Sequence, residues 1–478
     1  MHRSNLIAPF RVALILQLCA VTLYGQQAPP SPDKAWTVQR DPRFQAELAR
    51  LPAAARPALD PDHSYTLAEL VDLAERTNPE TRVAWEQAKQ KAAAAGIARS
   101  ALFPTIAALA SASINQYSLF VTRFYHEDLA TFPAALNLSY TVFDFGIRGA
   151  KIDKAKADLL AADFTFNDTH RRIVFQVTET YYRLLDAVSQ EVAAQATLTD
   201  ARTVQQAVKA RLANGLATLP DVLEARAATA QAQYELASVQ GLEEIARGAL
   251  ATVLGVSPAV TFHVENISSA PVPDTIGEPV QAIMQRALEQ RPDLLAQIAH
   301  IRSTDAEIVQ ARSAYAPVLS FSGDWGHRNS YGSQNSNPVI SGRIYPYTAQ
   351  LNLSWTLFDG GARRNELLHA EADRGEAQAK TASSRDRIEN EIWTAYSGFK
   401  TAQAQQASAI VLFQAAEQSY NAATEAFQAG VRTFLDVTTA QRELARARTA
   451  QATARVQVLT SLADLAFRVG DPIQGTGH

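Results

Sequence analysis

The chain contains two copies of one pattern, and this internal repeat restricts its fold more than any other sequence feature. The longest matching segments are residues 136–146 and 351–361, which read LNLSYTVFDFG and LNLSWTLFDGG. Three further pairs keep the same order at an offset of 213 to 215 residues: Asn78-Pro79-Glu80 with Arg291-Pro292-Asp293, residues 101–104 with 314–317, and Asn214-Gly215 with Ala429-Gly430. A unit of about 200 residues is far longer than a solenoid repeat, so it predicts two pseudo-symmetric halves of one architecture.

Each copy is predicted to fold as helix, strand, strand, long helix, helix. Pro79 and Pro292 are expected shortly after the start of the first helix, with Asn78 as its cap. This helix is expected to continue to about residues 102 and 314. Pro104 and Pro317 should then end it, because proline lacks the N–H group that a helix interior needs.

Beyond these prolines the apolar residues recur with a period of two. Residues 136–143, 318–325 and 351–358 alternate bulky apolar with small polar side chains, and residues 106–117 do so more weakly. The pattern suits a membrane barrel, with lipid on one face and water on the other, but also a soluble antiparallel sheet with one buried face. Aromatic residues favour the barrel, because their rings prefer membrane interfaces; they are Tyr140, Trp325, Tyr345, Tyr347 and Trp355. Residues 118–132 and 328–346 are predicted to be hairpin loops.

Two long helices are predicted after the strands. From residue 147 to 214 there is no proline and only one glycine, Gly149, and residues 362–429 mirror this stretch. About 65 helical residues would extend on the order of 100 Å and must pack side by side as coiled coils. Alone, these stretches would also suit a spectrin-like or filamentous protein. Strand pairs at the same place in both copies disfavour that alternative.

The N-terminus predicts export. His2, Arg3 and Arg11 precede an apolar segment, residues 12–23, that is too short to span a bilayer, as in a secretory signal peptide. An anchor helix is the alternative. The only cysteine, Cys19, lies in this segment after Leu18, whereas lipoprotein processing prefers a small residue there, so lipidation stays open but disfavoured. No later segment contains about 18 consecutive apolar residues, so no transmembrane helix is predicted.

Charge and motifs give no indication of an enzyme. The net charge is only −4, and lysines and arginines are scattered among acidic residues, which argues against nucleic-acid binding. The nine histidines are dispersed, and there is no HExxH, no glycine-rich phosphate loop and no Gly-x-Ser-x-Gly. We therefore predict no catalytic residues, no metal site and no cofactor.

Taken together, these features resemble the TolC-like outer-membrane efflux family (outer membrane factors) over residues 64–470. Two sets of residues carry the resemblance. They are the strand-to-helix corners, Phe143, Asp144, Gly146, Phe358, Asp359 and Gly361, and the helix tips, Gly215, Leu216, Gly430 and Val431. The resemblance implies a mainly α fold with a transmembrane β portion. A long coiled-coil α-barrel tunnel would continue into a twelve-stranded β-barrel shared by three chains, since four strands cannot close a barrel and an open edge in lipid leaves backbone groups unpaired.

The resemblance also implies a function, partners and gate residues. The chain would be an outer-membrane channel subunit of a tripartite efflux or secretion system, with a large periplasmic portion whose tips dock a periplasmic adaptor joined to an inner-membrane pump. Asp221 and Arg432 match a tip aspartate and a tip arginine, and Asp436 matches the first of two aspartates that ring the pore constriction. Where the family has the second aspartate, this chain has Thr439, so one acidic ring is missing. Where the family has a tip tyrosine, this chain has Phe427, which lacks the hydroxyl.

The predicted organisation has six parts: a signal peptide (1–25), a Pro/Ala-rich extension (26–62), a first repeat (63–255), a connector (256–278), a second repeat (279–470) and a tail (471–478). An envelope-spanning coiled-coil protein without a channel is the alternative function. Drugs, metal ions and secreted proteins are all compatible cargoes.

Overall fold

The computed structural model describes residues 46–47, 49–50, 59–120, 124–265, 278–334 and 337–470. The predicted signal peptide, Cys19, the C-terminal tail, residues 266–277 of the connector and most of the N-terminal extension lie outside these ranges. Residues 1–56 and 57–478 form separate compact units. In the first unit, the four described residues are helical.

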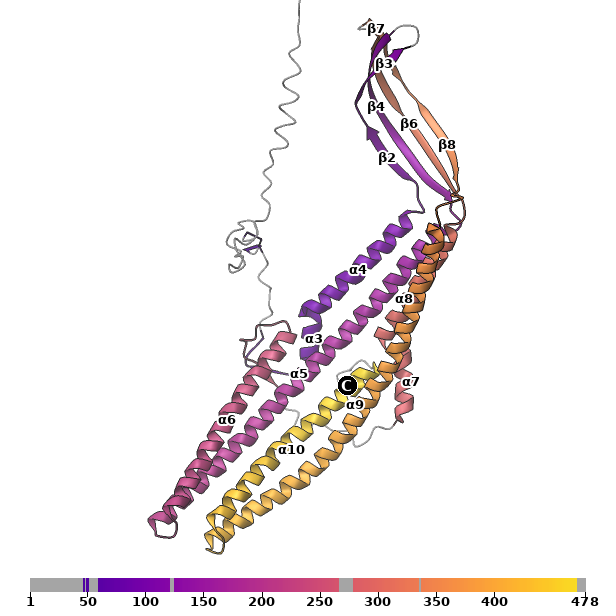
Figure 1. Ribbon diagram of the computed structural model, residues 1–478. Coiled ribbons are helices and arrows are strands. Elements are labelled where there is room, and N and C mark those ends of the chain that lie inside the picture. The colour runs from indigo at the N-terminus through magenta and orange to yellow at the C-terminus, as the bar shows by residue number, and fades with distance from the viewer. Residues whose placement is uncertain are drawn as a thin grey trace, which may run out of the picture. The chain divides into compact units, whose positions relative to one another are not determined.

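The second unit repeats one order of elements (Figure 1). The first copy contains β1 (Ser64–Tyr65), α3 (Leu67–Thr77), α4 (Pro79–Ser100), β2 (Thr105–Ala110), β3 (Ser113–Phe120), β4 (Phe124–Phe143), α5 (Ile147–Ala213) and α6 (Leu219–Val253). After β5 (His263–Val264), which pairs with β1 in parallel, the second copy contains α7 (Val280–Gln290), α8 (Pro292–Ser313), β6 (Val318–Gln334), β7 (Asn337–Ile344), β8 (Tyr347–Ser354), α9 (Ala362–Gln428) and α10 (Phe434–Val469).

In each copy a short helix that was not predicted, α3 or α7, precedes the predicted first helix, which is α4 or α8. Asn78 ends α3 and begins α4, where its side-chain oxygen accepts a hydrogen bond from the Glu80 backbone N–H at 2.7 Å. Each proline therefore occupies the first position of a new helix, where its missing N–H costs nothing. The predicted cap at Asn78 is confirmed, and α4 and α8 end just before Pro104 and Pro317.

Strands β2, β3, β4, β6, β7 and β8 form one antiparallel sheet with four strand positions. Strands β2 and β3 both pair with β4, β4 pairs with β6, and β6 pairs with both β7 and β8. The prediction of hairpin loops at residues 118–132 and 328–346 was wrong, because most of these residues belong to β3, β4, β6 and β7. Residues 355–358, predicted as strand, lie beyond the end of β8.

One face of this sheet is apolar and the other is polar. The register places Leu136 opposite Trp325, and Trp325 opposite Tyr347. The next row is polar, and Asn137 Nδ2 donates to Asp324 Oδ1 at 2.9 Å. Because successive side chains alternate between faces, the two rows point to opposite sides of the sheet.

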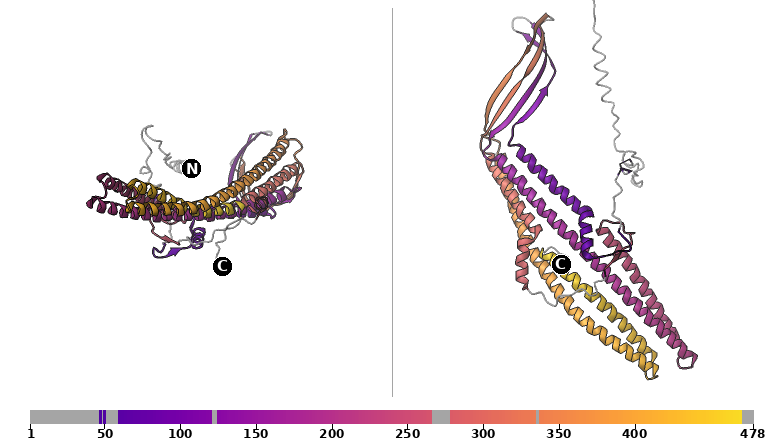
Figure 2. Two further views of the ribbon diagram at one scale, coloured as in Figure 1. Left: turned by 90° about the horizontal axis from the view of Figure 1, so that it is seen from below. Right: turned by 180° about the vertical axis from the view of Figure 1, so that it is seen from behind.

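The two 67-residue helices, α5 and α9, begin where predicted and end within one residue of the predicted bounds. Helix α5 packs against α4, α6, α8 and α10, and α9 packs against α8 and α10. Figures 1 and 2 show α5–α6 and α9–α10 as two long hairpins whose turns lie at the end away from the sheet. In the described ranges, none of the helices has an apolar stretch long enough to cross a membrane.

Candidate functional site

The turns that join α5 to α6 and α9 to α10 have the same construction. Gly215 and Gly430 have φ angles of +70° and +77°, a left-handed conformation that glycine adopts without strain. Leu216 and Val431 follow them and are 65% and 79% exposed. Both tips therefore present an apolar side chain to the solvent at the outermost point of a tight turn.

Asp221 and Asp436 hold the first turns of α6 and α10. The Thr218 backbone N–H and hydroxyl donate to Asp221 Oδ2 at 2.8 and 2.7 Å. Thr433 donates to Asp436 Oδ2 in the same way, at 3.0 and 2.8 Å. These are reciprocal capping boxes. Sequence reasoning missed both threonines, although the spacing Thr-x-x-Asp in both copies was a usable signal.

Arg432 contacts the aspartate of its own tip. Its guanidinium lies 3.6 Å from Asp436 Oδ1, and both side chains are partly exposed. Hydrogen bonds from Thr433, supplemented by the charge of Arg432, hold the pKa of Asp436 below its usual range, so this carboxylate stays charged in mildly acidic solution. Within the described part of one chain, Arg432 does not reach Asp221. Thr439 is exposed on the first turns of α10.

Phe427, where the family tyrosine is missing, makes a contact that sequence reasoning did not foresee. The guanidinium of Arg211, in the last turn of α5, lies 4.6 Å from the centre of the Phe427 ring. Arg211 also donates from Nη1 to the Gln428 carbonyl at 3.1 Å. The Phe427 ring in turn lies 5.7 Å from that of Phe434, which opens α10. A basic residue near a helix C-terminus is common, so the sequence around Arg211 did not indicate a functional role.

An apolar cluster joins the two hairpins behind this contact. It contains Val204, Val208 and Ala225 from the first hairpin and Ala423, Phe434, Val437 and Ala440 from the second. Two polar contacts also join the hairpins. Thr438 Oγ1 donates to Glu224 Oε1 at 3.1 Å, and Arg448 Nη1 donates to Asp200 Oδ2 at 2.5 Å.

At the strand-to-helix corners, each aspartate binds an arginine four residues later. Asp144 accepts from the Arg148 backbone N–H and Nε at 3.0 and 2.8 Å. Asp359 accepts the same pair from Arg363 at 3.1 and 2.6 Å. The bonds from Arg363 hold the pKa of Asp359 below its usual range. Sequence reasoning missed both arginines, although they recur at the offset of the repeat.

Each corner turns through a glycine with positive φ, and the residue before it differs between copies. Gly146 and Gly361 have φ angles of +101° and +90°. The preceding residue is Gly360 in the second copy, at +68°, but Phe145 in the first, at +52°. Because a side chain disfavours this region, Phe145 is strained, and its ring lies 4.6 Å from that of Phe143.

The residue before each proline ties the start of its repeat to the end of the same repeat. Asn78 Nδ2 donates to the Val253 carbonyl at 2.9 Å, and the neighbouring Thr77 hydroxyl donates to the Leu254 carbonyl at 2.7 Å. In the second repeat, Arg291 Nη1 donates to the Arg468 carbonyl at 3.2 Å. Both contacts satisfy carbonyl groups at a helix C-terminus, which have no partner within the helix. We call these contacts the first and second joints.

The second joint also belongs to an ionic cluster with Arg291 buried at its centre. Arg291, 4% exposed, donates from Nε and Nη2 to Asp293 at 3.0 and 2.8 Å, and from Nη1 to Glu391 at 2.8 Å. Other members of the cluster are Asp168, Arg171, Arg387, Asp464 and Arg468. Although burial opposes ionisation, the bonds from Arg291 hold the pKa of Asp293 below its usual range.

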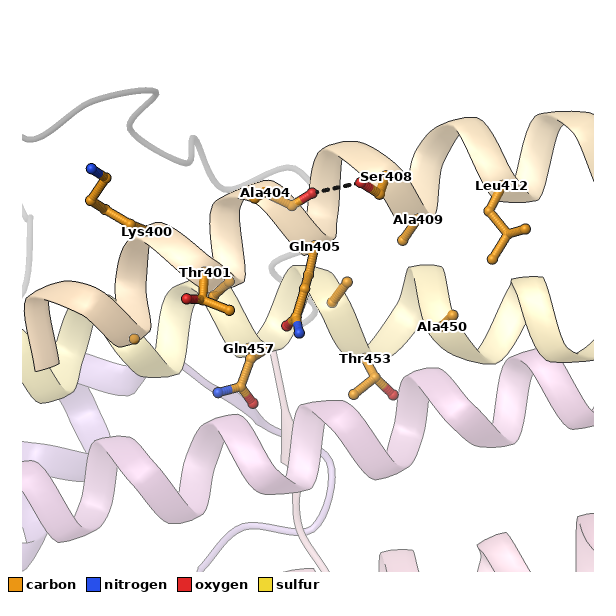
Figure 3. Close-up of a pocket in the computed structure, with 13 residues that line it drawn as sticks. Lys400, Thr401, Ala404, Gln405, Ser408, Ala409, Leu412, Ala450, Thr453 and Gln457 are labelled. Atoms are coloured by element: carbon orange, nitrogen blue, oxygen red, sulfur yellow. Dashed lines mark hydrogen bonds between the residues drawn. The ribbon is translucent and has the colours of Figure 1, made fainter. Parts of the chain in front are cut away.

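Two grooves run along the helices. One, of about 1210 Å³, follows α9 and α10 and is lined mostly by alanine, glutamine and threonine side chains, including Gln405 and Gln457 (Figure 3). The other, of about 1080 Å³, lies between the hairpins, with Glu224, Tyr234 and Arg442 among its lining residues. Among the described residues, no three His, Cys, Asp or Glu side chains gather as a metal site would need.

The sequence and the fold of this chain are similar to those of several known proteins. A family model described as "Outer membrane efflux protein" matches residues 70–256 and 283–471. Protein CyaE of Bordetella pertussis is 29% identical over 372 residues, covering 76% of this chain and 75% of CyaE. Cobalt-zinc-cadmium resistance protein CzcC of Cupriavidus metallidurans is 28% identical over 305 residues, covering 63% and 69%. The solved outer-membrane channel OprN has the same fold, with a TM-score of 0.75 at 22% identity, over 88% of this chain and 96% of OprN.

Proposed function

Because the chain belongs to the outer membrane efflux protein family, we propose that three copies of it form the exit duct of a tripartite efflux system. The observation that carries this proposal is the family match, which covers both repeats. The chain is an outer-membrane channel subunit with a large periplasmic helical portion, and this role replaces the alternative of a coiled-coil protein without a channel. Members of this family are efflux proteins and not enzymes.

The sheet supports a barrel made from several chains. It has one apolar and one polar face, and within the described residues its outermost strands, β2–β3 on one side and β7–β8 on the other, each pair with a single neighbouring strand position. Backbone groups on an open edge would be unpaired in lipid, so both edges need partners. Three copies of four strand positions would close a twelve-stranded barrel with the apolar face toward lipid.

The helical hairpins would continue this barrel as a periplasmic tunnel, with the tips at its entrance. Three Asp436 carboxylates, kept charged by their capping boxes, would then ring the narrowest part and favour cations. Thr439 adds no second acidic ring. Asp221 and Arg432 remain the proposed tip residues of the closed state.

The exposed turns suit a partner protein. Leu216 and Val431 offer apolar contacts on a narrow protrusion, and Gly215 and Gly430 leave backbone groups accessible beside them. A periplasmic adaptor that joins an inner-membrane pump would dock there. We assign the choice of cargo to the pump, because the side chains that line the two grooves are mostly small or uncharged polar groups.

Ion selectivity of the purified protein in a planar bilayer tests this function. The variant Asp436→Asn removes the charge but keeps an oxygen that can accept the Thr433 bonds, so it tests charge separately from helix capping. We expect steady currents from the native protein, with the cation preference reduced in the variant. Asp72→Asn, on α3 and 65% exposed, is the control and should behave like the native protein. Unchanged selectivity would reject Asp436 as the constriction, and no current from any assembled variant would reject the channel.

A further inference from the structure

We propose that Arg211 is the clasp that holds the α9–α10 hairpin against the α5–α6 hairpin at their tips, so that its release widens the channel entrance. This inference rests on the proposed function, and it identifies a residue that controls how far the channel entrance opens. The clasp comprises the Arg211 guanidinium, the Phe427 ring and the Gln428 carbonyl.

The contact of Arg211 matches the chemistry at the end of α9. The last carbonyl groups of a helix lack partners within it and carry the negative end of the helix dipole. The Gln428 carbonyl is one of them, and Arg211 donates to it at 3.1 Å. The flat guanidinium also lies 4.6 Å from the centre of the Phe427 ring, within the range of a cation–π interaction. A planar, permanently charged group can make both contacts at once, which a lysine ammonium does less well.

The clasp reaches both sides of the second turn. Phe427 lies in the last turn of α9, and its ring contacts that of Phe434, the first residue of α10. Phe434 is buried in the apolar cluster between the hairpins. One arginine of the first hairpin therefore contacts the end of α9 directly and the start of α10 through a single ring.

Farther from the tips the hairpins are joined by the Arg448–Asp200 pair and by the ionic cluster at the second joint. They meet mainly through α5 and α10, whereas α6 and α10 make few contacts. A groove lies between α6 and α10, and its lining includes Glu224, Glu235, Arg442 and Arg446. Charged and polar walls can be hydrated at little cost when helices separate. At the tips themselves, separation is opposed by the apolar cluster, the Thr438–Glu224 bond and Arg211.

Arg211 is held in a way that allows release. Its side chain is partly buried, and its Nε–H has no hydrogen-bond partner although it is shielded from solvent. An unsatisfied buried donor is unfavourable, and it would gain water if the hairpins separated. The clasp thus stabilises the joined state without making it permanent.

The test measures open probability in planar bilayers for the full-length native protein and for Arg211→Ala, Arg211→Lys and Phe427→Leu. Loss of one charge-assisted hydrogen bond should raise the open probability of Arg211→Ala by roughly tenfold or more. Arg211→Lys should give a smaller increase, because it keeps the charge but loses the planar stack. Phe427→Leu should also increase opening, and the double variant should add less than the sum of the two single effects.

Controls separate the clasp from folding and from the channel itself. Arg202→Ala removes an exposed arginine from the same helix and should leave open probability unchanged. Helix content and oligomer mass should match the native protein in every variant. Native-like open probability in Arg211→Ala, with steady currents in the native protein, would overturn the clasp and leave the channel intact. A complete absence of current in the assembled native protein and all variants would instead reject the channel, and the clasp with it.

Discussion

The first and second joints connect the start of a repeat to its last helix, but they do so with different chemistry. In both repeats, the residue before a proline binds carbonyl groups at the C-terminus of the repeat's last helix. Asn78 does so with a neutral amide, whereas the buried Arg291 does so as part of an ionic cluster that joins α5, α8, α9 and α10. The first joint closes one repeat on itself, while the cluster at the second also connects the two repeats. Duplication preserved the position of the contact but not its energetics.

Alanine substitution of Arg291 and of Asn78 should give the largest difference in stability between the two joints. Arg291→Ala leaves Asp293 and Glu391 without their main buried partner, so we expect it to lower the free energy of unfolding by about 3–5 kcal/mol. Asn78→Ala removes a cap and one hydrogen bond and should cost about 1–2 kcal/mol. Denaturant unfolding followed by helical circular dichroism measures both. Arg76→Ala, in an exposed pair on α3, should change little, and equal costs for Asn78→Ala and Arg291→Ala would break the comparison.

Alanine substitution of the glycines beside the joints should destabilise the first joint more than the second. A Cβ on Gly255 would lie 3.0 Å from the Thr77 carbonyl oxygen, which belongs to the backbone of the first joint. A Cβ on Gly470 would lie 3.1 Å from Arg291 Cγ, in a side chain that can shift. Both glycines have positive φ, so alanine costs about 1–2 kcal/mol from conformation alone. Gly255→Ala should therefore destabilise more than Gly470→Ala in the same assay, and the reverse order would show that the second joint is the more rigid.

Acid should weaken only the second joint. Asp293 has a pKa below its unfolded value, so its stabilising contribution is full above the unfolded pKa and is lost as the pH falls through the folded pKa. We expect stability to decline below about pH 4, the ordinary pKa of an aspartate. Asp293→Asn should flatten this decline, whereas Asn78→Ala should leave its shape unchanged. A native-like decline in Asp293→Asn would assign the acid sensitivity to other carboxylates.

Substitutions at the two strand-to-helix corners should give the smallest difference in stability between the repeats. Phe145 has positive φ where the second corner has Gly360, so Phe145→Gly should relieve strain of about 1 kcal/mol, less the loss of its contact with Phe143. Gly360→Ala should introduce a similar strain in the second corner, where a Cβ meets no atom within 4 Å. Thermal unfolding of both variants measures the effect. Destabilisation by Phe145→Gly would mean that the ring contact outweighs the strain.

Periodicity and repetition made much of this fold predictable. The long helices lack proline and are rich in helix formers, so their bounds could be read within one residue. The corner aspartates and glycines recur at a constant offset, which located both corners. The length of the strands was not predictable in this way. Residues 328–334 are rich in Asn, Ser and Gly and look like a loop, yet pairing with β4, about 200 residues away, holds them in a strand.

Contacts between distant side chains explain what sequence reasoning missed at the tips. Arg211 and Gln428 are 217 residues apart, and neither lies in a motif that names the other. The capping threonines and corner arginines were different, since both recur in the two copies and could have been found by aligning them. The gate assignments of Asp221, Arg432, Asp436, Thr439 and Phe427 concern several chains together and remain proposals.

The number of chains in the native particle tests the central claim most directly. A sheet with four strand positions and two open edges needs partners in lipid, and we propose that three copies supply them. Native mass spectrometry of protein extracted from outer membranes in mild detergent should give three copies per particle, dissociating to single chains on heating. A stable single chain that remains folded in the outer membrane would contradict the account.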